Sequence, residues 1–159
     1  MAIAPGAAYR FRLRATDTAG NTSSWVTTSA AKLALVQENA TSITYAGTWK
    51  RVSMTAASGG YVKYATRSGA TATLTFSGTS VALVTDTGPA RGLAELWLDG
   101  HKVATLDLYS ATVAKKQLVW APTAPLAAGS HTLQLTVLGA KNAHSTSTRV
   151  DLDAFAVWG

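Results

Sequence analysis

Short apolar runs separated by Gly, Ser and Thr recur at the 8–12-residue spacing of sandwiches and barrels from about residue 32 to the C-terminus. Apolar residues at helical spacing never continue beyond two turns. The pattern predicts an all-β fold, an antiparallel β-sandwich. We expect strands near residues 41–46, 49–54, 60–66, 70–77, 79–86, 92–99, 102–109, 116–121, 130–138 and 148–158.

The N-terminal segment has a stricter alternation. Tyr9, Phe11, Leu13 and Ala15 alternate with three arginines at positions 10, 12 and 14, which predicts a half-buried strand. Residues 17–21 supply turn chemistry, and residues 26–35 offer a second strand. The segment is therefore expected to form a β-hairpin.

Asp99-Gly100 predicts a tight hairpin between the strands 92–99 and 102–109. A strict two-residue loop would put the leucines of the second strand on the face opposite those of the first. A loop extended through His101, or a bulge soon after it, returns them to one face. We expect this second register because it buries four leucines together. It leaves several side chains outside the core: Glu95, Trp97, Asp107 and Tyr109, with Arg91 opposite Tyr109.

Composition narrows the class of protein. The 159 residues are 47% hydrophobic, which excludes a disordered chain, and no apolar run approaches the roughly 18 residues of a membrane span. The 14 Lys and Arg exceed the 8 Asp and Glu, but the longest basic run is Lys115-Lys116. Since the charge is dispersed, we expect neither nucleic acid nor membrane as a partner, whereas acidic polysaccharide stays open. Cysteine is absent, so the sequence contains no thiolate site.

The first segment resembles the last hairpin of a fibronectin type III domain. The similarity lies in Tyr9-Arg-Phe-Arg-Leu-Arg-Ala followed by Asp17-Thr-Ala-Gly-Asn-Thr-Ser. That sandwich needs seven strands and about 100 residues, and fewer than ten precede Tyr9. The resemblance implies that residues 1–33 are the C-terminal hairpin and linker of a truncated domain, in a piece of a larger secreted protein. The alternative is a native first hairpin of a single domain.

Residues 34–159 resemble galactose-binding-like β-sandwich modules attached to bacterial carbohydrate-active and cell-surface proteins. The resemblance implies a jelly roll of two antiparallel sheets, a ligand site on end loops or an outer sheet face, and often a structural calcium. The similarity lies in the order and spacing of five short segments over some eighty residues. These segments are Phe76-Ser-Gly-Thr-Ser-Val81, Gly92-Leu-Ala-Glu-Leu-Trp-Leu-Asp-Gly100, Leu106-Asp-Leu-Tyr-Ser110, Leu126-Ala-Ala-Gly-Ser-His-Thr-Leu133 and Arg149-Val-Asp-Leu-Asp-Ala-Phe155.

Sugar binding requires flat apolar surfaces for pyranose rings and planar polar groups for hydroxyl pairs. Two sets of candidates meet this requirement. The first set lies on the outer strand face, where Trp97 and Tyr109 supply the rings and Arg91 and Asp107 form a hydrogen-bonding pair. The second set is Asn142 and His144 in the loop 139–148. The alternatives are a face that packs on the hairpin or forms a cross-strand salt bridge, and a loop that is merely solvated.

For the calcium, the resemblance implies Glu38 and Asp153, near the first and last strands of the module. The alternative is that Asp151 or Asp153 bonds nearby backbone or Arg149. The three histidines are isolated in sequence, so zinc is not expected.

An enzyme is not expected either. The sequence lacks a Gly-x-Ser-x-Gly elbow, a cysteine nucleophile and a phosphate-binding glycine loop. We therefore expect a non-catalytic module that binds a polysaccharide or oligosaccharide, favouring acidic glycans, tethered to catalytic or cell-surface domains of a secreted or cell-surface protein. The competing hypothesis is a structural or adhesion spacer that binds no sugar.

Overall fold

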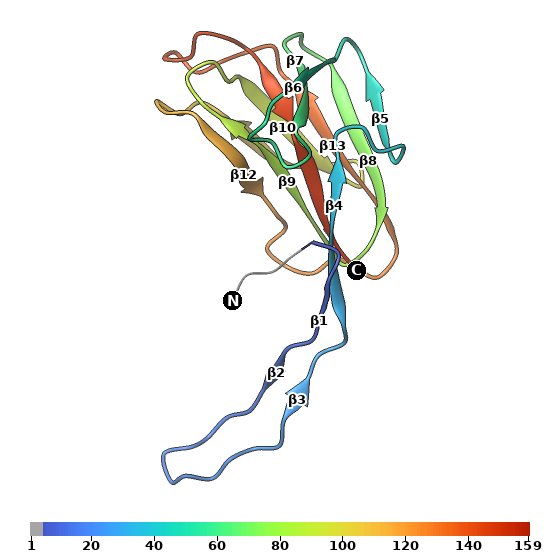
Figure 1. Cartoon of the computed structure of the whole chain (residues 1–159), viewed down its shortest axis with the longest axis vertical. Helices are drawn as coiled ribbons and strands as arrows, with labels where there is room; N and C mark the ends of the chain where they lie inside the picture. The colour runs from blue at the N-terminus through green and yellow to red at the C-terminus, as the bar shows by residue number, and fades with distance from the viewer. Residues whose placement is uncertain (1–4) are drawn as a thin grey trace.

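Two five-stranded sheets face each other and form the body of the molecule (Figure 1). The structure, a computed structural model, describes residues 5–159. One sheet has the order β1 (Ala8–Tyr9), β4 (Ala31–Gln37), β15 (Ala154–Trp158), β9 (Ser80–Thr87) and β12 (Ala114–Trp120). The other has the order β11 (His101–Asp107), β10 (Leu93–Leu98), β13 (Ser130–Val137), β8 (Thr71–Ser77) and β5 (Ile43–Ala46).

Two smaller sheets complete the structure. One contains β14 (Val150–Leu152), β7 (Tyr61–Ala65) and β6 (Lys50–Ser53), and the other pairs β2 (Arg12–Leu13) with β3 (Val26–Thr27). The strand pairs are antiparallel, and residues 5–159 contain no helix. None of the described residues therefore forms a helix that could span a membrane. The predicted all-β antiparallel sandwich is confirmed.

The core lies between the two large sheets. Alternate residues of β8 and β13 point inward, so Leu74, Leu133 and Leu135 are fully buried, and they meet Leu83 and Phe155 in the same apolar cluster. Burying such a side chain stabilises the fold by about 1.5–3 kcal/mol. The period-two pattern of the sequence thus sets the inner face of each sheet.

The β10–β11 hairpin has the register that the leucines favour. Leu98 pairs with His101 across a two-residue turn, in which Asp99 and Gly100 have φ angles of 50° and 78°. A bulge follows at once, because Ala104 opposes Leu96 while Lys102 opposes Trp97. The bulge brings the leucines of both strands into the core cluster. The expected register is confirmed, and it leaves Glu95, Trp97 and Asp107 on the outer face.

The predicted strand 148–158 is broken at Asp153. Before it, β14 pairs with β7; after it, β15 inserts between β4 and β9. The Asp153 carboxylate accepts hydrogen bonds from the backbone N–H and the hydroxyl of Ser58. These bonds fix the point at which the chain passes from one sheet to the other.

The N-terminal hairpin continues from the sandwich through β4 and projects from one end (Figure 1). Its predicted turn is confirmed, because one carboxylate oxygen of Asp17 accepts the N–H groups of Ala19 and Asn21. The predicted half-burial is wrong: Phe11 is 48% exposed and Leu13 is 74% exposed. The hairpin joins the sheet of β4, so it leaves the outer face of β10 and β11 uncovered.

Candidate functional site

The segment 139–149 lies at the end of the sandwich opposite the hairpin and is fastened to residues 88–93 by backbone hydrogen bonds (Figure 1). Leu93 donates to the carbonyl of Ala140 at 2.9 Å, and Thr146 donates to the carbonyl of Pro89 at 2.9 Å. The backbone of the loop is therefore hydrogen-bonded to the protein near both of its ends. This differs from the predicted alternative of a loop that is merely solvated.

Ser145 anchors the middle of this loop. Its side chain is buried, and its hydroxyl donates to the carbonyl of Arg91 at 2.7 Å. The opposing segment approaches too closely for a side chain at Gly92, where a Cβ would lie 2.5 Å from the carbonyl carbon of Thr148. The loop is therefore held by a buried hydroxyl and by direct backbone contact.

Four of the predicted residues meet beside this loop, and we call Asp107, Tyr109, Asn142 and His144 the end-loop cluster. The side-chain amide of Asn142 donates to Asp107 Oδ2 at 2.6 Å, and its oxygen accepts the N–H of His144 at 2.9 Å. Asp107 Oδ1 accepts the N–H of Tyr109 at 2.9 Å. The rings of Tyr109 and His144 lie 5.9 Å apart at 33°. Candidates from two separate predictions thus form one surface.

The end-loop cluster combines the groups that sugar hydroxyls bind. Asp107 and His144 are exposed, while Tyr109 and Asn142 are half-buried. The Asp107 carboxylate has unused lone pairs, and the Asn142 amide has a second N–H. The His144 and Tyr109 side chains each offer a ring face and a polar atom. Such a surface can hydrogen-bond adjacent hydroxyls and stack against a ring.

Arg91 does not belong to this cluster, and its expected pairing with Asp107 is wrong. Its guanidinium is buried, with Nε 2.5 Å from Asp151 Oδ2 and a terminal nitrogen 3.7 Å from Asp86 Oδ2. The close approach is an ion contact without hydrogen-bond alignment, since Arg91 Nε and Asp151 Oδ2 have no hydrogen-bond partner among the described residues. Two fully buried carboxylates require counter-charges, which explains why the arginine turns inward.

Two more cations complete this buried charge group. Arg149 donates to Asp151 Oδ1 at 2.6 Å and 2.9 Å, and Lys115 donates to Asp86 Oδ2 at 2.8 Å. Burial raises the pKa of Asp151, against the opposing effects of Arg149 and Arg91. The alternative that Asp151 bonds Arg149 is the one observed.

Trp97 lies on the outer face as expected, but away from the cluster. Asp107 is opposite Leu93, four residues before Trp97 on β10. At about 3.4 Å per residue, the Cα atoms that carry the two side chains are separated by roughly 14 Å along the sheet. Trp97 is half-buried opposite Lys102 and does not extend the end-loop cluster.

Glu38 and Asp153, the residues that the resemblance implies for calcium, have separate protein partners. Glu38 is buried and accepts from Arg51 Nε at 2.8 Å, whereas Asp153 binds Ser58. Burial raises the pKa of Asp153. Residues 5–159 contain no group of three or more His, Asp or Glu that could hold a metal. As arranged, these two side chains do not supply the six to eight oxygens that calcium takes, and calcium stays a prediction of the resemblance.

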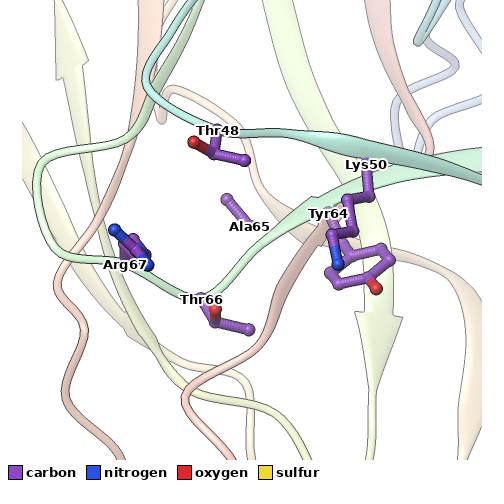
Figure 2. Close-up of a pocket in the computed structure, with 6 residues that line it drawn as sticks. All are labelled: Thr48, Lys50, Tyr64, Ala65, Thr66 and Arg67. Atoms are coloured by element: carbon purple, nitrogen blue, oxygen red, sulfur yellow. The ribbon is translucent and has the colours of Figure 1, made fainter.

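A hollow of about 480 Å³ beside β6 and β7 was not predicted (Figure 2). It is lined by Thr48, Lys50, Tyr64, Ala65, Thr66 and Arg67. The sequence does contain a signal for its basic lining, since residues 39–85 include four basic residues and no Asp or Glu. Periodicity could not reveal it, because a hollow depends on how strand ends meet.

Comparison with known proteins identifies the fold. No family model and no curated protein matches the chain. A xanthan lyase from Paenibacillus matches 77% of this chain with a TM-score of 0.58 and 18% identity. A two-domain esterase active on acetylated mannans, co-crystallised with mannopentaose, matches 80% with a TM-score of 0.57 and 16% identity.

A third neighbour is an exo-β-1,3-galactanase from Phanerochaete chrysosporium in complex with β-1,3-galactotriose, matching 84% of this chain with a TM-score of 0.53 and 18% identity. The chain spans 13%, 37% and 30% of these three proteins, respectively. Its structural neighbours are therefore β-sandwich parts of larger carbohydrate-active enzymes, and at this identity they show a shared fold.

Proposed function

We propose that the chain is a non-catalytic glycan-binding module of a larger secreted or cell-surface protein, and that it holds sugar at the end-loop cluster. The observation that carries the proposal is the meeting of Asp107 and Tyr109 with Asn142 and His144 on one accessible surface. A carboxylate, an amide and two rings match the hydroxyls and ring faces of a pyranose.

Binding without catalysis fits the same surface. Glycoside hydrolysis usually needs two carboxyl groups across the scissile bond, and the end-loop cluster contributes one, Asp107, which already bonds Asn142. The three neighbours are named for enzymes, and this chain matches 13–37% of their length. A module of this kind would hold a tethered catalytic or cell-surface domain near its polysaccharide by raising the effective concentration.

The second candidate function is a structural or adhesion spacer with a truncated fibronectin type III hairpin at one end. The exposed hairpin favours it, because Phe11, Leu13 and Val26 present an apolar surface that another domain would cover. This function needs no sugar and leaves the end-loop cluster without a role.

A glycan panel separates the two functions. We would measure retention on neutral and acidic polysaccharides by affinity electrophoresis and pull-down, with and without EDTA. Selective retention supports the module, and its loss in EDTA would support the calcium implied for Glu38 and Asp153. Retention by none, or by every acidic polymer only at low salt, would favour the spacer.

A matched pair of double variants then tests the site. Asn142→Ala with His144→Ala should weaken binding at least tenfold, while Asn39→Ala with His101→Ala, which removes the same residue types from exposed positions elsewhere, should not. Melting temperatures would show that both variants are folded. Equal binding by the two would remove the end-loop cluster from the sugar site.

A further inference from the structure

One stretch of the chain has a net positive charge because it lacks acidic residues. Residues 39–85 contain four basic residues and no acidic residue. Two of them have partners: Arg51 pairs with Glu38, and Lys63 lies 3.8 Å from the ring centroid of Tyr45. The side chains of Lys50 and Arg67 make no ion pair or hydrogen bond with any other residue in 5–159. Two cations of this stretch therefore stay available.

These two cations line the same hollow (Figure 2). Lys50 pairs with Tyr64 across β6 and β7, and Arg67 follows β7 by two residues. The hydroxyl groups of Thr48 and Thr66 add donors at the rim, and neither is hydrogen-bonded within the described chain. At about 480 Å³ the hollow falls within the ~300–1,000 Å³ of ligand pockets.

The surroundings leave this charge uncompensated. The nearest carboxylate in the neighbouring strand is Asp151, opposite Tyr64, but it is fully buried and already shared by Arg91 and Arg149. Arg149, which pairs with Asp151, also lies over the Tyr64 ring, 3.9 Å from its centroid. None of the lining residues is acidic.

We propose that this hollow is an anion subsite that binds the carboxylate of a uronic acid residue in a glycan. Arg67 offers a planar fork for both carboxylate oxygens, and Lys50 offers a point charge. The threonine hydroxyls and Tyr64 then meet the sugar hydroxyls. A glycan as the source of the carboxylate rests on the proposed function, whereas the preference for an anion rests on the hollow alone.

The loop 139–149 connects this hollow with the end-loop cluster. The Thr148 hydroxyl donates to the backbone carbonyl of Thr66 at 2.9 Å, and Asn142 of the same loop bonds Asp107. Gly139 packs against the Ser68 backbone, where a Cβ would lie 2.7 Å from the Ser68 nitrogen. One loop thus contacts both places.

The test uses the whole chain and a pair of charge-matched variants. Lys50→Gln with Arg67→Gln lowers the net charge by two, and Arg10→Gln with Lys32→Gln lowers it equally at exposed positions on the hairpin side. Calorimetry would measure binding of an oligogalacturonate, its methyl ester, a sulfated oligosaccharide without uronate, and inorganic sulfate, at 150 mM salt. Melting temperatures would confirm folding of each variant.

We expect the first variant to lose at least tenfold in affinity for the oligogalacturonate, with the control variant unchanged. We also expect the methyl ester to bind the unmodified chain at least tenfold more weakly than the oligogalacturonate. An equal loss in both variants would mean dispersed charge and would overturn the subsite. Preference for the sulfated oligosaccharide or inorganic sulfate would overturn the uronate assignment.

Failure of the subsite and failure of the proposed function give different results. If neutral glycans bind and only Asn142→Ala with His144→Ala weakens them, the glycan module stands whatever Lys50 and Arg67 do. If no neutral glycan binds but galacturonate binding depends on Lys50 and Arg67, the anion subsite stands without the end-loop cluster. Absence of oligogalacturonate binding to the unmodified chain overturns the subsite directly.

Discussion

Asn142 donates a 2.6 Å hydrogen bond to Asp107, joining the loop before the last strands to the end of β11 across 35 positions of the sequence. The bond fixes the amide so that its oxygen accepts the His144 N–H, and His144 lies beside Tyr109. The polar groups of the end-loop cluster are therefore arranged by one another before any ligand arrives, which lowers the entropic cost of binding.

Asn142→Asp should separate the two segments, because it sets a carboxylate against the Asp107 carboxylate. We expect a loss of about 0.5–1.5 kcal/mol in the free energy of unfolding, measured in urea, since both groups are partly solvated. The exchanged pair Asp107→Asn with Asn142→Asp restores a donor and an acceptor and should recover most of that loss. Equal stability of the single and exchanged variants would contradict the role of this bond.

Gly92→Ala should displace the loop that carries Asn142. The new Cβ would lie 2.5 Å from the carbonyl carbon and 2.8 Å from the Cα of Thr148, so backbone has to move. We expect destabilisation of about 1–3 kcal/mol and faster amide exchange over 139–149. Gly129→Ala is the control, since nothing lies within 4 Å of a Cβ there. Unchanged exchange in the loop would show that Gly92 does not set its position.

Arg91→Met should destabilise the fold more than any surface substitution. It removes a buried counter-charge from Asp86 and Asp151, both 0% exposed, and breaking such a group costs about 3–5 kcal/mol. Arg67→Met, at an exposed position, should stay within about 0.5 kcal/mol. Urea unfolding of both variants measures the difference, and similar values would mean that Lys115 and Arg149 suffice.

The register of β10 and β11 could be predicted because two independent signals agree there. Asp99-Gly100 fixes the turn, and the alternating leucines require a bulge to share one face. These signals place Asp107 outside the core correctly. The packing of the loop 139–149 has no periodic signal, so its contact with Asp107 required the structure.

Arg91 shows where sequence reasoning fails. Extending the register predicts its position opposite Tyr109, which is wrong, because Tyr109 bridges Gly88. The buried carboxylates of Asp86 and Asp151 hold the Arg91 side chain inward. Whether an aspartate is buried depends on which strands cover it, and strand order does not follow from alternation. The same limit applies to Phe11 and Leu13, whose alternation identifies an apolar face without showing what covers it.

The Asp99–His131 pair should make stability depend on pH. His131 Nδ1 lies 2.7 Å from Asp99 Oδ2 and Nε2 lies 2.8 Å from the Ala127 carbonyl, so both ring nitrogens face acceptors. These contacts raise the pKa of His131, the Ala127 carbonyl first and the Asp99 carboxylate second. The Thr132 N–H and His131 lower the pKa of Asp99.

Because the histidine pKa is raised on folding, its contribution is complete below the unfolded value of about 6.5 and is lost as pH rises through the folded pKa. The aspartate contribution is complete above about 3.9 and is lost as pH falls through its lowered pKa. The unmodified chain should therefore have a higher melting temperature than His131→Gln. This difference in melting temperature should be largest between about pH 4 and 6.5 and should become smaller at alkaline pH. His101→Gln, at an exposed position, is the control. A gap that is constant from pH 4 to 9 would show that His131 acts through packing on Phe76 and not through its charge.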